Sequence, residues 1–396
     1  MKQHALAPVQ IIDLTHYLAG PYCTKLLAGF GADVVKIERP ERGDPLRQRE
    51  PFYKGKADVE HSIPFLWLNT GKKSITLNLK TAQGASLLKK LVAKADVLVE
   101  NFAPRVLPEL GLDYGVLRDV NPRLVMASIS NFGQTGPYRD YLADERVIGA
   151  LSGQMDNTGA ADSPPLASAP ALNQYAAGMH AYTAILMALL QRGNGDKGQH
   201  IDISIMETGV EQIENRLNNY LRTGKVAKRG AHVFAPWGLY PCKDGYATII
   251  SAPFRHWIKG AKLFDEPRLL DSRYRHARDR ARNREKIDEL IEPWVRCHDK
   301  REIFRAGQEH GLSFGYLADA QEVLESPQHR ERRFFSDVEH PKTGRRSYAD
   351  APFKLSRCPW KTERAPLLGE HNQEIYGKRL GYPATTLQQW HREGAI

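Results

Sequence analysis

The strongest constraint on the fold is a repeated strand-helix-strand pattern in the first third of the chain. An apolar strand IIDL (11–14) is followed by a helical stretch TKLLAGFG and by a second apolar strand, ADVVKIE, that ends at Glu38. The pattern returns as a strand at 74–79, a helix at 81–95, the strand DVLVEN and a strand at 123–130. Neighbouring parallel strands need crossover connections, which are usually helices. The sequence therefore predicts an α/β fold with a parallel sheet.

The rest of the chain divides at changes of pattern. A glycine- and proline-rich passage at 131–170 is where functional loops are expected, and the helix after it, AAGMHAYTAILMALLQR (176–192), is apolar nearly all round and so predicted to be buried. TGKVAKRG (223–230) is a candidate linker. A hairpin turning at 243–245, helices over 256–322, a second hairpin at 338–356 and a C-terminal helix follow. We expect a large α/β domain over 1–222, a small domain over 223–335, and a segment over 336–396 that returns to the large domain.

Composition and simple motifs exclude several classes of protein. The chain has 396 residues, 41% of them hydrophobic, and its longest uncharged apolar stretch (179–190) is too short to cross a bilayer. The N-terminus lacks the apolar run of a signal peptide, so a cytoplasmic protein without a membrane partner is predicted. The four cysteines form no CxxC pair and the 14 histidines are scattered, so no disulfide framework or metal site is expected.

The charge balance favours an anionic partner. Lys and Arg number 56 against 46 Asp and Glu, which gives a net charge of +10. Nucleic acid, an acidic protein and a phosphorylated cofactor all fit this charge alone. A nicotinamide cofactor is disfavoured because LAGFGADVV lacks the third glycine of a dinucleotide loop, and GNGDKGQH (193–200) is a helix end rather than a phosphate loop.

Two polar pairs are candidate site residues from residue type alone. Asp144 and Glu145 follow the glycine- and proline-rich loop, so they are either a carboxylate pair at the mouth of a cleft or an ordinary exposed acidic pair. Asn173 and Gln174 stand at the start of the apolar helix, where unpaired N–H groups favour a polar group. For this second pair the simple interpretation is a helix cap.

Six ordered blocks make the chain resemble the class III CoA-transferases of the CaiB/BaiF type, the family of formyl-CoA transferase, carnitine CoA-transferase and α-methylacyl-CoA racemase. The resemblance covers nearly the whole chain. The blocks are LTHYLAGPYCTKLLAGFGADVVKIERPERGDPLR, LNTGKKSITLNLKTAQG, VENFAPRVLPELGLDYGVLRDVNPRLVMASISNFGQTGPY, ALLQRGNGDKGQHIDISIMET, PWGLYPCKDGY and APLLGEHNQEI.

The resemblance implies a Rossmann-like large domain with a smaller α+β domain, two subunits being interlinked like chain links. It implies coenzyme A and a carboxylic acid as substrates, no permanently bound cofactor and no nucleic acid. The residues placed against CoA by motif position are His16, Tyr17, Leu18 and Ala19 in the first loop, Arg39 and Lys73 as phosphate ligands, and Asn101, Phe102 and Arg105 near the nucleotide.

The chemistry of the family uses an aspartate nucleophile that forms an acyl anhydride and then an enzyme thioester with CoA. This Asp precedes the helix glycine by four residues. Here the glycine is Gly178, so Gln174 stands at the position of the nucleophile. Other departures lie at Leu18, Asn131 and Glu109, where some members carry glutamine, glycine and a basic residue.

The chain keeps the motifs that the resemblance assigns to CoA binding but lacks the aspartate. This combination leaves several hypotheses open. The chain is a nucleophile-deficient subunit paired with an active homologous chain, as the resemblance to benzylsuccinate CoA-transferases suggests. Such an enzyme would move CoA between succinyl-CoA and an aryl- or alkylsuccinate. Alternatively it is a self-sufficient transferase that uses Glu145, a racemase, or a non-catalytic CoA-binding scaffold.

Overall fold

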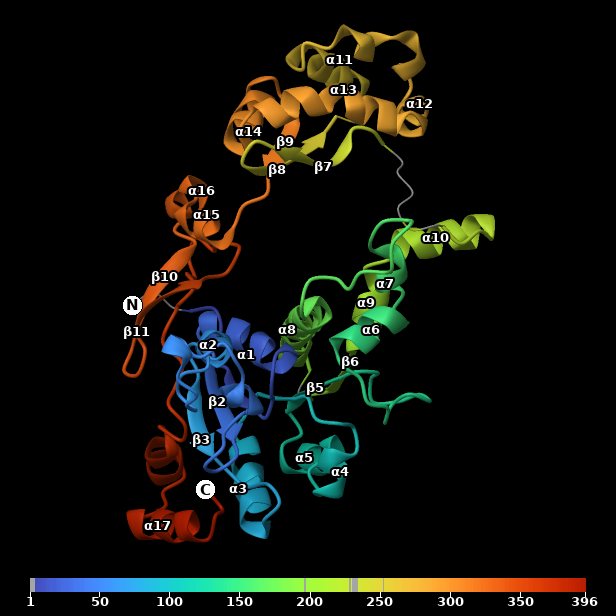
Figure 1. Cartoon of the computed structure of the whole chain (residues 1–396). Coiled ribbons are helices and arrows are strands. Elements are labelled where there is room, and N and C mark those ends of the chain that lie inside the picture. Colours follow the sequence, from blue (N-terminus) through green and yellow to red (C-terminus); the bar gives the residue numbers. More distant parts are fainter. Residues whose placement is uncertain (1–3, 196, 228, 230–233, 252) are drawn as a thin grey trace. The chain divides into compact units, whose positions relative to one another are not determined.

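The computed structural model describes residues 4–195, 197–227, 229, 234–251 and 253–396. Contacts divide the chain into two compact units, each labelled by its elements in Figure 1. Unit 1 consists of Met1–Val226 and Arg333–Ile396, and unit 2 of Ala227–Arg332. Each unit has its own hydrophobic core.

Unit 1 is built on a six-stranded parallel sheet, as the strand-helix-strand pattern predicts. Its strands lie in the order β3-β2-β1-β4-β5-β6, and every neighbouring pair is parallel. The strands are β1 (Gln10–Asp13), β2 (Asp33–Glu38), β3 (Lys73–Thr76), β4 (Val97–Glu100), β5 (Val125–Ser130) and β6 (His200–Ser204). The order changes direction between β1 and β4, and open α/β sheets bind ligands beyond the carboxyl ends of the strands at such a point.

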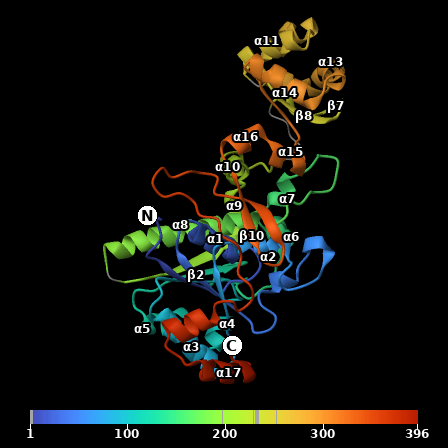
Figure 2. The ribbon, with the colours of Figure 1, turned by 90° about the vertical axis from the view of Figure 1, so that its left-hand side faces the viewer.

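Helices cover both faces of this sheet (Figure 2). Because successive strand side chains alternate, Val34 joins the core under one set of helices and Val35 the core under the other. One face carries α1 (Ala19–Gly29) and α8 (Leu172–Gly193). The other carries α3 (Ala82–Val92), α5 (Tyr114–Val120), a π-helix (Gln373–Arg379) and α17 (Ala384–Arg392). The C-terminal segment thus packs into unit 1.

Shorter elements connect these layers. They are the 3₁₀ helices Pro45–Gln48 and Tyr53–Gly55, α2 (Ile63–Leu68), α4 (Val106–Glu109), α6 (Glu145–Leu151), α7 (Gln154–Asn157), α9 (Ile205–Glu211), α10 (Glu214–Thr223) and the antiparallel hairpin of β10 (Phe335–His340) and β11 (Gly344–Ala349). The passage at 131–170 therefore holds two short helices, α6 and α7, between its loops.

Close packing of α8 on α1 explains the glycine in the helix pattern. A Cβ atom at Gly178 would lie 2.6 Å from the carbonyl oxygen of Ala19, a distance that real Cβ atoms do not adopt. Gly178 lets the two backbones approach, and this approach sets the position of Gln174 one turn earlier in α8.

The prediction that the helix at 176–192 is buried all round is wrong for one of its faces. Ala177, Ala181 and Ile185 are buried against the sheet and α1, but Met187 is 65% exposed and Leu190 75% exposed. The reason is that a helix lying on one face of a sheet buries one stripe of side chains, and the described part of unit 1 does not cover the opposite stripe.

Unit 2 combines a three-stranded antiparallel sheet with helices. Its strands are β7 (Trp237–Cys242), β8 (Gly245–Ile250) and β9 (Ser313–Tyr316), in the order β7-β8-β9. The helices are α11 (Phe254–Leu263), the 3₁₀ helices Pro267–Leu270 and Ser272–Tyr274, α12 (Ala277–Arg282), α13 (Arg284–Cys297), α14 (Lys300–Glu309), α15 (Ala320–Glu325) and α16 (Pro327–Glu331).

Two sequence expectations for this part of the chain need comment. The helices expected over 256–322 are interrupted by β9, which pairs with β8. The four residues of β9, SFGY, are too few to show a periodic pattern in the sequence. The linker predicted at 223–230 falls partly outside the described residues. Among the helices that the structure describes, none is long and apolar enough to cross a membrane.

Candidate functional site

Four predicted site residues come together at the carboxyl edge of the parallel sheet. His16 follows β1, Arg39 follows β2, and Asn101 and Phe102 follow β4. The backbone N–H of His16 donates to Oδ1 of Asn101 at 2.7 Å, and Nδ2 of Asn101 donates to the carbonyl oxygen of His16 at 2.8 Å. The His16 ring also meets Phe102 edge to face, with centroids 5.3 Å apart. This reciprocal pair fixes the two loops to each other.

Buried charges hold the first loop from below. Nζ of Lys36 donates to the carbonyl oxygen of Thr15 at 2.7 Å and lies 2.9 Å from Oδ2 of Asp44, with both ionic side chains fully buried. Asp13 forms a second fully buried pair, 3.0 Å from Nζ of Lys72. Burial opposes the ionisation of Asp13, but the neighbouring Lys36 and Lys72 hold its pKa well below the usual range. The loop therefore rests on fixed charges that need no rearrangement when a ligand binds.

The remainder of the first loop has an unusual backbone. Tyr17 has a φ of 63°, in the left-handed region that side chains other than glycine disfavour, and its N–H donates to Oδ1 of Asp44 at 3.2 Å. Leu18 precedes the first turn of α1, and Ala19 is fully buried. The turn at Tyr17 lets α1 begin directly beside the carboxyl end of β1.

His16 is uncharged at neutral pH. Burial lowers its pKa to about 4, since the favourable influence of Asp44 is weaker than the cost of burying a charge and Lys36 and Arg39 oppose protonation. Its imidazole therefore offers one donor and one acceptor nitrogen to a ligand rather than a positive charge. Because the charge of Arg39 contributes to the lowered pKa of His16, the exposed Arg39 lies near this loop.

The structure does not bring Lys73 and Arg105 into the same arrangement. Lys73 starts β3, at the amino edge of the sheet, where Nζ lies 3.0 Å from Oδ1 of Asp33 and 2.9 Å from Oε1 of Glu374. Arg105 follows β4 at the carboxyl edge, but its side chain is exposed and its Nε lies 3.9 Å from Oε1 of Glu109. Lys73 thus lies at the opposite edge from His16 and Asn101, which is information that spacing in sequence does not carry.

The second group of candidates meets at the N-terminus of α8. Oε1 of Glu145, the first residue of α6, accepts hydrogen bonds from the N–H of Asn173 at 2.8 Å and from its Nδ2 at 3.0 Å. Nδ2 of Asn173 also donates to Oε1 of Gln154 at 3.0 Å. Gln174, the next residue, is half-buried. A carboxylate thus occupies the positive end of a 22-residue helix.

The helix-cap interpretation of Asn173 and Gln174 is wrong in its detail. α8 begins at Leu172, after Ala171 in a left-handed conformation (φ 63°), and no side chain of its own start caps it. Asn173 lies inside the first turn and is fully buried, with its amide acting as a donor. The cap comes instead from Glu145 on another helix, a contact of two residues 28 positions apart that local sequence does not reveal.

The environment of Glu145 raises its pKa. Burial is the largest cause, and the hydrogen bonds from Asn173 act in the opposite direction. Oε2 of Glu145 is buried and has no hydrogen-bond partner among the described residues. The carboxyl group is therefore held by hydrogen bonds at one oxygen, whereas its other oxygen is buried and has no partner among the described residues.

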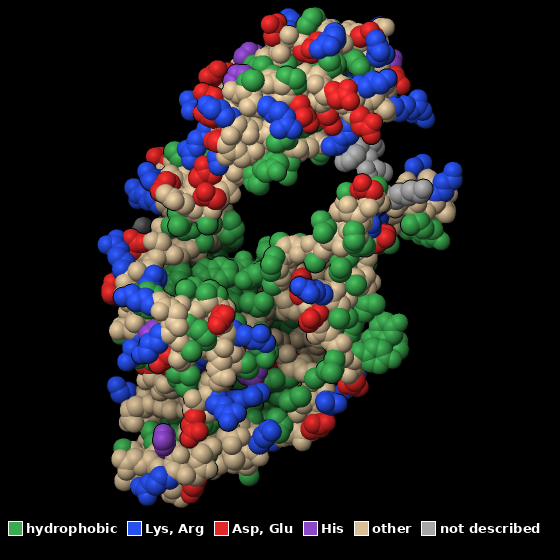
Figure 3. All heavy atoms as spheres, in the orientation of Figure 1, with side chains coloured by type: hydrophobic (Ala, Val, Ile, Leu, Met, Phe, Trp, Pro, Cys, Tyr) green, Lys and Arg blue, Asp and Glu red, His purple; other side chains and the backbone are tan. Residues whose placement is uncertain are grey.

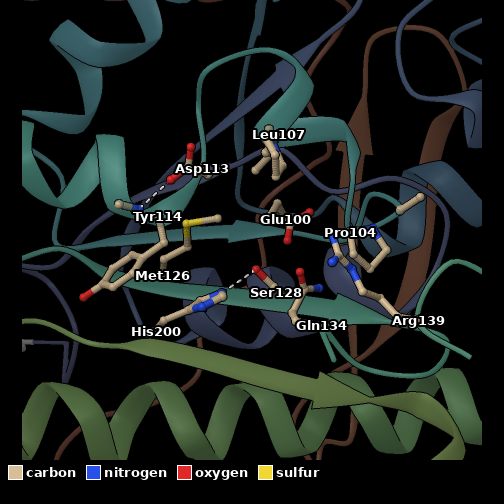
Figure 4. Close-up of a pocket in the computed structure, with 13 residues that line it drawn as sticks. Glu100, Pro104, Leu107, Asp113, Tyr114, Met126, Ser128, Gln134, Arg139 and His200 are labelled. Carbon is tan, nitrogen blue, oxygen red and sulfur yellow. Dashed lines mark hydrogen bonds between the residues drawn. The ribbon is translucent and has the colours of Figure 1, made fainter. Parts of the chain in front are cut away.

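A pocket of about 250 Å³ lies beside the Asn101 loop, over β4, β5 and the start of β6. Figure 4 shows Glu100, Ser128, Gln134 and Arg139 gathered at one end, with His200 nearby. Glu100 accepts the N–H of Phe102 at 2.8 Å, and Ser128 Oγ lies 2.8 Å from Nε2 of His200. Burial raises the pKa of Glu100 to about 7. Glu100 thereby couples this pocket to the loop that carries Asn101.

Sequence reasoning missed the residues that support the site. Arg47 binds Glu38 through Nε at 2.7 Å and Nη2 at 3.0 Å, and its guanidinium lies 3.7 Å from the ring centroid of Phe65. This fully buried pair lies in the quoted block KIERPERGDPLR, but an Arg in a charged loop carries no signal of burial. In the part of the chain that the structure describes, no three His, Cys, Asp or Glu side chains are grouped to hold a metal ion.

Comparison of the chain with known proteins finds similarity to one family. The family model of CoA-transferase family III matches residues 6–372. Formyl-CoA:oxalate CoA-transferase of Streptomyces avermitilis is 33% identical over 99% of this chain and 99% of its own length. Succinyl-CoA:(R)-benzylsuccinate CoA-transferase subunit BbsE of Thauera aromatica is 30% identical over 98% of this chain and 97% of its own. The crystal structure of a CAIB/BAIF family protein from Brucella suis superposes with a TM-score of 0.85 at 31% identity, covering 94% of this chain and 99% of that one.

Proposed function

This chain belongs to CoA-transferase family III, and we propose that it is a CoA-thioester-binding subunit that lacks the usual nucleophile of the family and acts with a second, catalytically complete chain. The acids proposed for the complete enzyme are succinate, as succinyl-CoA, and an aryl- or alkylsuccinate. The similarity to a protein named as a transferase subunit supports this assignment.

The observation that carries the proposal is the residue at the N-terminus of α8. Gln174 stands four residues before the glycine that packs on α1, where the resemblance places an aspartate. An amide oxygen has no negative charge and is a poor nucleophile toward a thioester carbonyl. The helix dipole that would stabilise an ionised nucleophile instead faces Glu145, which Asn173 binds.

CoA binding is proposed at the carboxyl edge, at His16, Tyr17, Asn101 and Arg39. The fixed loops supply backbone and imidazole groups, and Arg39 supplies the one cation of this set for a phosphate. Arg39→Ala should weaken CoA affinity by about tenfold or more, because a hydrogen bond to a charged group contributes ~1.5–3 kcal/mol. If calorimetric titration shows that Arg39→Ala binds CoA as tightly as the wild type, the phosphates bind elsewhere. Lys73→Ala, at the amino edge of the sheet, serves as a control.

A partner chain is proposed on the uncovered face of α8 and on α10. Met179, Met187 and Leu190 on α8 and Leu221 on α10 are each more than half exposed, and Figure 3 shows hydrophobic side chains spread over the surface of unit 1. Apolar surface of this kind is common where subunits pack. It supports the interlinked dimer implied by the resemblance, with a homologous active subunit as the partner.

The test is exchange activity with and without the missing carboxylate. The purified chain should bind CoA but show negligible transfer of CoA from succinyl-CoA to benzylsuccinate, and Gln174→Asp should introduce transfer activity. The matched control is Gln174→Asn, which keeps an amide and should stay inactive. Robust exchange by the unmodified chain alone would contradict the proposal.

One observation favours a second candidate function, a self-sufficient transferase with Glu145 as nucleophile. Oε2 of this residue is unpaired within the described part of the chain, and its raised pKa makes the ionised oxygen a better nucleophile. In that case the pure chain is active, Glu145→Gln abolishes exchange, and hydroxylamine trapping followed by mass spectrometry locates the modification on Glu145. A modification found elsewhere removes this candidate.

A further inference from the structure

An apolar pocket lies between α2 and β11, separate from the residues described above. Its volume is about 310 Å³, and it lies wholly within unit 1. Its walls are mostly aromatic and aliphatic, and one cation stands among them; the main lining side chains are Tyr53, Ile63, Leu66, Trp67, Tyr348 and Arg346. Small-molecule sites have this character, with an apolar lining and a few polar groups, and this volume suits a single ring with a short chain.

The walls of the pocket are held by the fold. α2 begins after Ser62, whose Oγ donates to the carbonyl oxygens of Leu46 at 2.7 Å and Arg49 at 2.9 Å. Leu66 and Tyr348 are buried parts of one hydrophobic cluster, so α2 and β11 are packed together at the base of the pocket. Trp67 and Ile63 project from the same helix to form its side. The cavity is therefore a preformed feature.

Arg346 is a cation that has no counter-ion among the described residues. Its Nε and Nη2 donate to the carbonyl oxygen of Thr343 at 3.2 Å and 3.0 Å, and its guanidinium carbon lies 3.9 Å from the ring centroid of Tyr53. In the described part of the chain no carboxylate forms an ion pair with it, whereas its neighbour Arg345 pairs with Asp337. A guanidinium fixed at the edge of an apolar cavity is suited to bind a carboxylate.

We propose that this pocket binds a carboxylic acid with an aromatic or branched apolar body, the body lying against Trp67 and Tyr348 and a carboxylate meeting Arg346. The inference rests on the proposed function, since it identifies the pocket as a site for the acid co-substrate and names the chemical class of that acid. A short acid without an apolar body would leave most of the lining uncovered.

Aromatic contacts connect the pocket with the start of α8. The Trp67 ring stacks on Tyr22 with centroids 6.0 Å apart and meets Tyr175 at 6.0 Å, and Tyr175 is the residue after Gln174. Nζ of Lys25 lies 4.7 Å from the Trp67 ring centroid, which fixes the indole further. One wall of the pocket, the Trp67 ring, thus contacts the residue beside the nucleophile position.

The experiment is calorimetric titration of the full-length chain with phenylsuccinate and with its uncharged diamide, and separately with CoA. The wild type should bind phenylsuccinate at least about tenfold more tightly than the diamide, as expected for a charge-assisted hydrogen bond. Arg346→Gln should remove this preference, and Trp67→Leu should weaken binding of both ligands. The matched control Arg345→Gln, on the opposite face of β11 and paired with Asp337, should bind as the wild type does.

Separate readouts distinguish the two proposals. Equal binding of the acid and the diamide by the wild type would overturn the pocket proposal without the need for any variant, and so would an Arg346→Gln protein that keeps the preference. If phenylsuccinate binds in the Arg346-dependent way but CoA does not bind, the proposed function fails while the acid site stands. If CoA binds and phenylsuccinate does not, the acid site fails while the proposed function stands.

Discussion

The two units of this protein differ in whether they bury ion pairs, although unit 1 has exposed pairs as well and unit 2 buries the cation Arg280. In unit 1, both side chains of the pairs Asp13–Lys72, Lys36–Asp44 and Glu38–Arg47 are fully buried. In unit 2, both side chains of every ion pair described remain at least 14% exposed. Figure 3 shows acidic and basic side chains next to each other over the visible surface of unit 2.

This difference follows from what the two sets of charges do. Burying an ion pair costs desolvation free energy that its attraction hardly recovers, so a buried pair is weak evidence for stabilisation. In unit 1 the buried charges bind the carbonyl oxygen of Thr15 and the N–H of Tyr17, and so hold the loop proposed for CoA. The ion pairs of unit 2 keep access to solvent, and some of them, such as Lys300–Glu322, join neighbouring helices. The comparison teaches that the buried Lys36–Asp44 pair lies where it fixes the loop after β1.

The largest effect is expected from breaking a buried pair. Lys72→Met removes one of the two buried cations that favour ionised Asp13 and should lower the free energy of unfolding by about 3–5 kcal/mol, because loss of one partner of a buried ion pair is strongly unfavourable. Urea denaturation measures this change. Lys300→Met in unit 2 is the control, since its partner Glu322 keeps solvent access and should cause far less loss. Equal losses in the two variants would break the comparison between the units.

A smaller effect, with a distinct pH dependence, is expected at Glu100. Its pKa is raised from 4.5 to about 7 by burial, so the folded state holds a proton that the unfolded state releases as pH rises. The contribution of Glu100 to the free energy of unfolding is fully present below about pH 4.5. This free energy falls by about 3 kcal/mol as the pH rises to 8. Glu100→Gln should remove this fall, as measured by denaturation at several pH values.

Glu322 in unit 2 provides the control of opposite sign. Its hydrogen bond with Lys300 is the largest cause that lowers its pKa to about 2, so its contribution is present above pH 4.5 and is lost only as pH falls toward 2. Glu322→Gln should therefore leave the pH profile between 4.5 and 8 as it is in the wild type. A flat wild-type profile, with no effect of Glu100→Gln, would show that Glu100 is ionised normally.

The smallest effect is expected at an exposed pair of unit 2. Arg273 and Asp271 lie 2.9 Å apart with side chains 58% and 38% exposed, and water screens such a pair. Arg273→Ala should denature at the same urea concentration as the wild type, within error, at both low and high salt. A clear loss at low salt that disappears at high salt would mean that surface charges of unit 2 matter more than the comparison allows.

Much of the fold was accessible from sequence because its signals are local. The strands around Ile11, Val35, Leu98 and Ala127 are short apolar runs separated by helices, and they form the predicted parallel sheet. The turn at Asp244 and Gly245 was also placed correctly. Strand β9 escaped notice because β8, the strand with which it pairs, lies more than 60 residues earlier in the chain.

The grouping of several candidate residues was accessible from sequence for the same reason. His16, Arg39 and Asn101 follow predicted strands, and parallel strands bring their carboxyl ends to one edge. Lys73 has the charge expected of a phosphate ligand. The sequence does not show at which residue β3 begins, and so it does not show that Lys73 lies at the amino edge of the sheet. Arg47 and Lys72 look like ordinary surface cations in the sequence, and only the structure shows them buried.

The sequence by itself determined the alternation of strands and helices, the family, and the amide at position 174, because each depends on residue type and on near neighbours. Tertiary structure alone decided that Glu145 lies against the start of α8, that Lys73 lies at the amino edge of the sheet, and that Arg346, beside an aromatic cavity, has no carboxylate partner among the described residues. These facts join residues far apart in the chain. Burial and pairing of a charge are set by what surrounds it in space, and no local pattern encodes that.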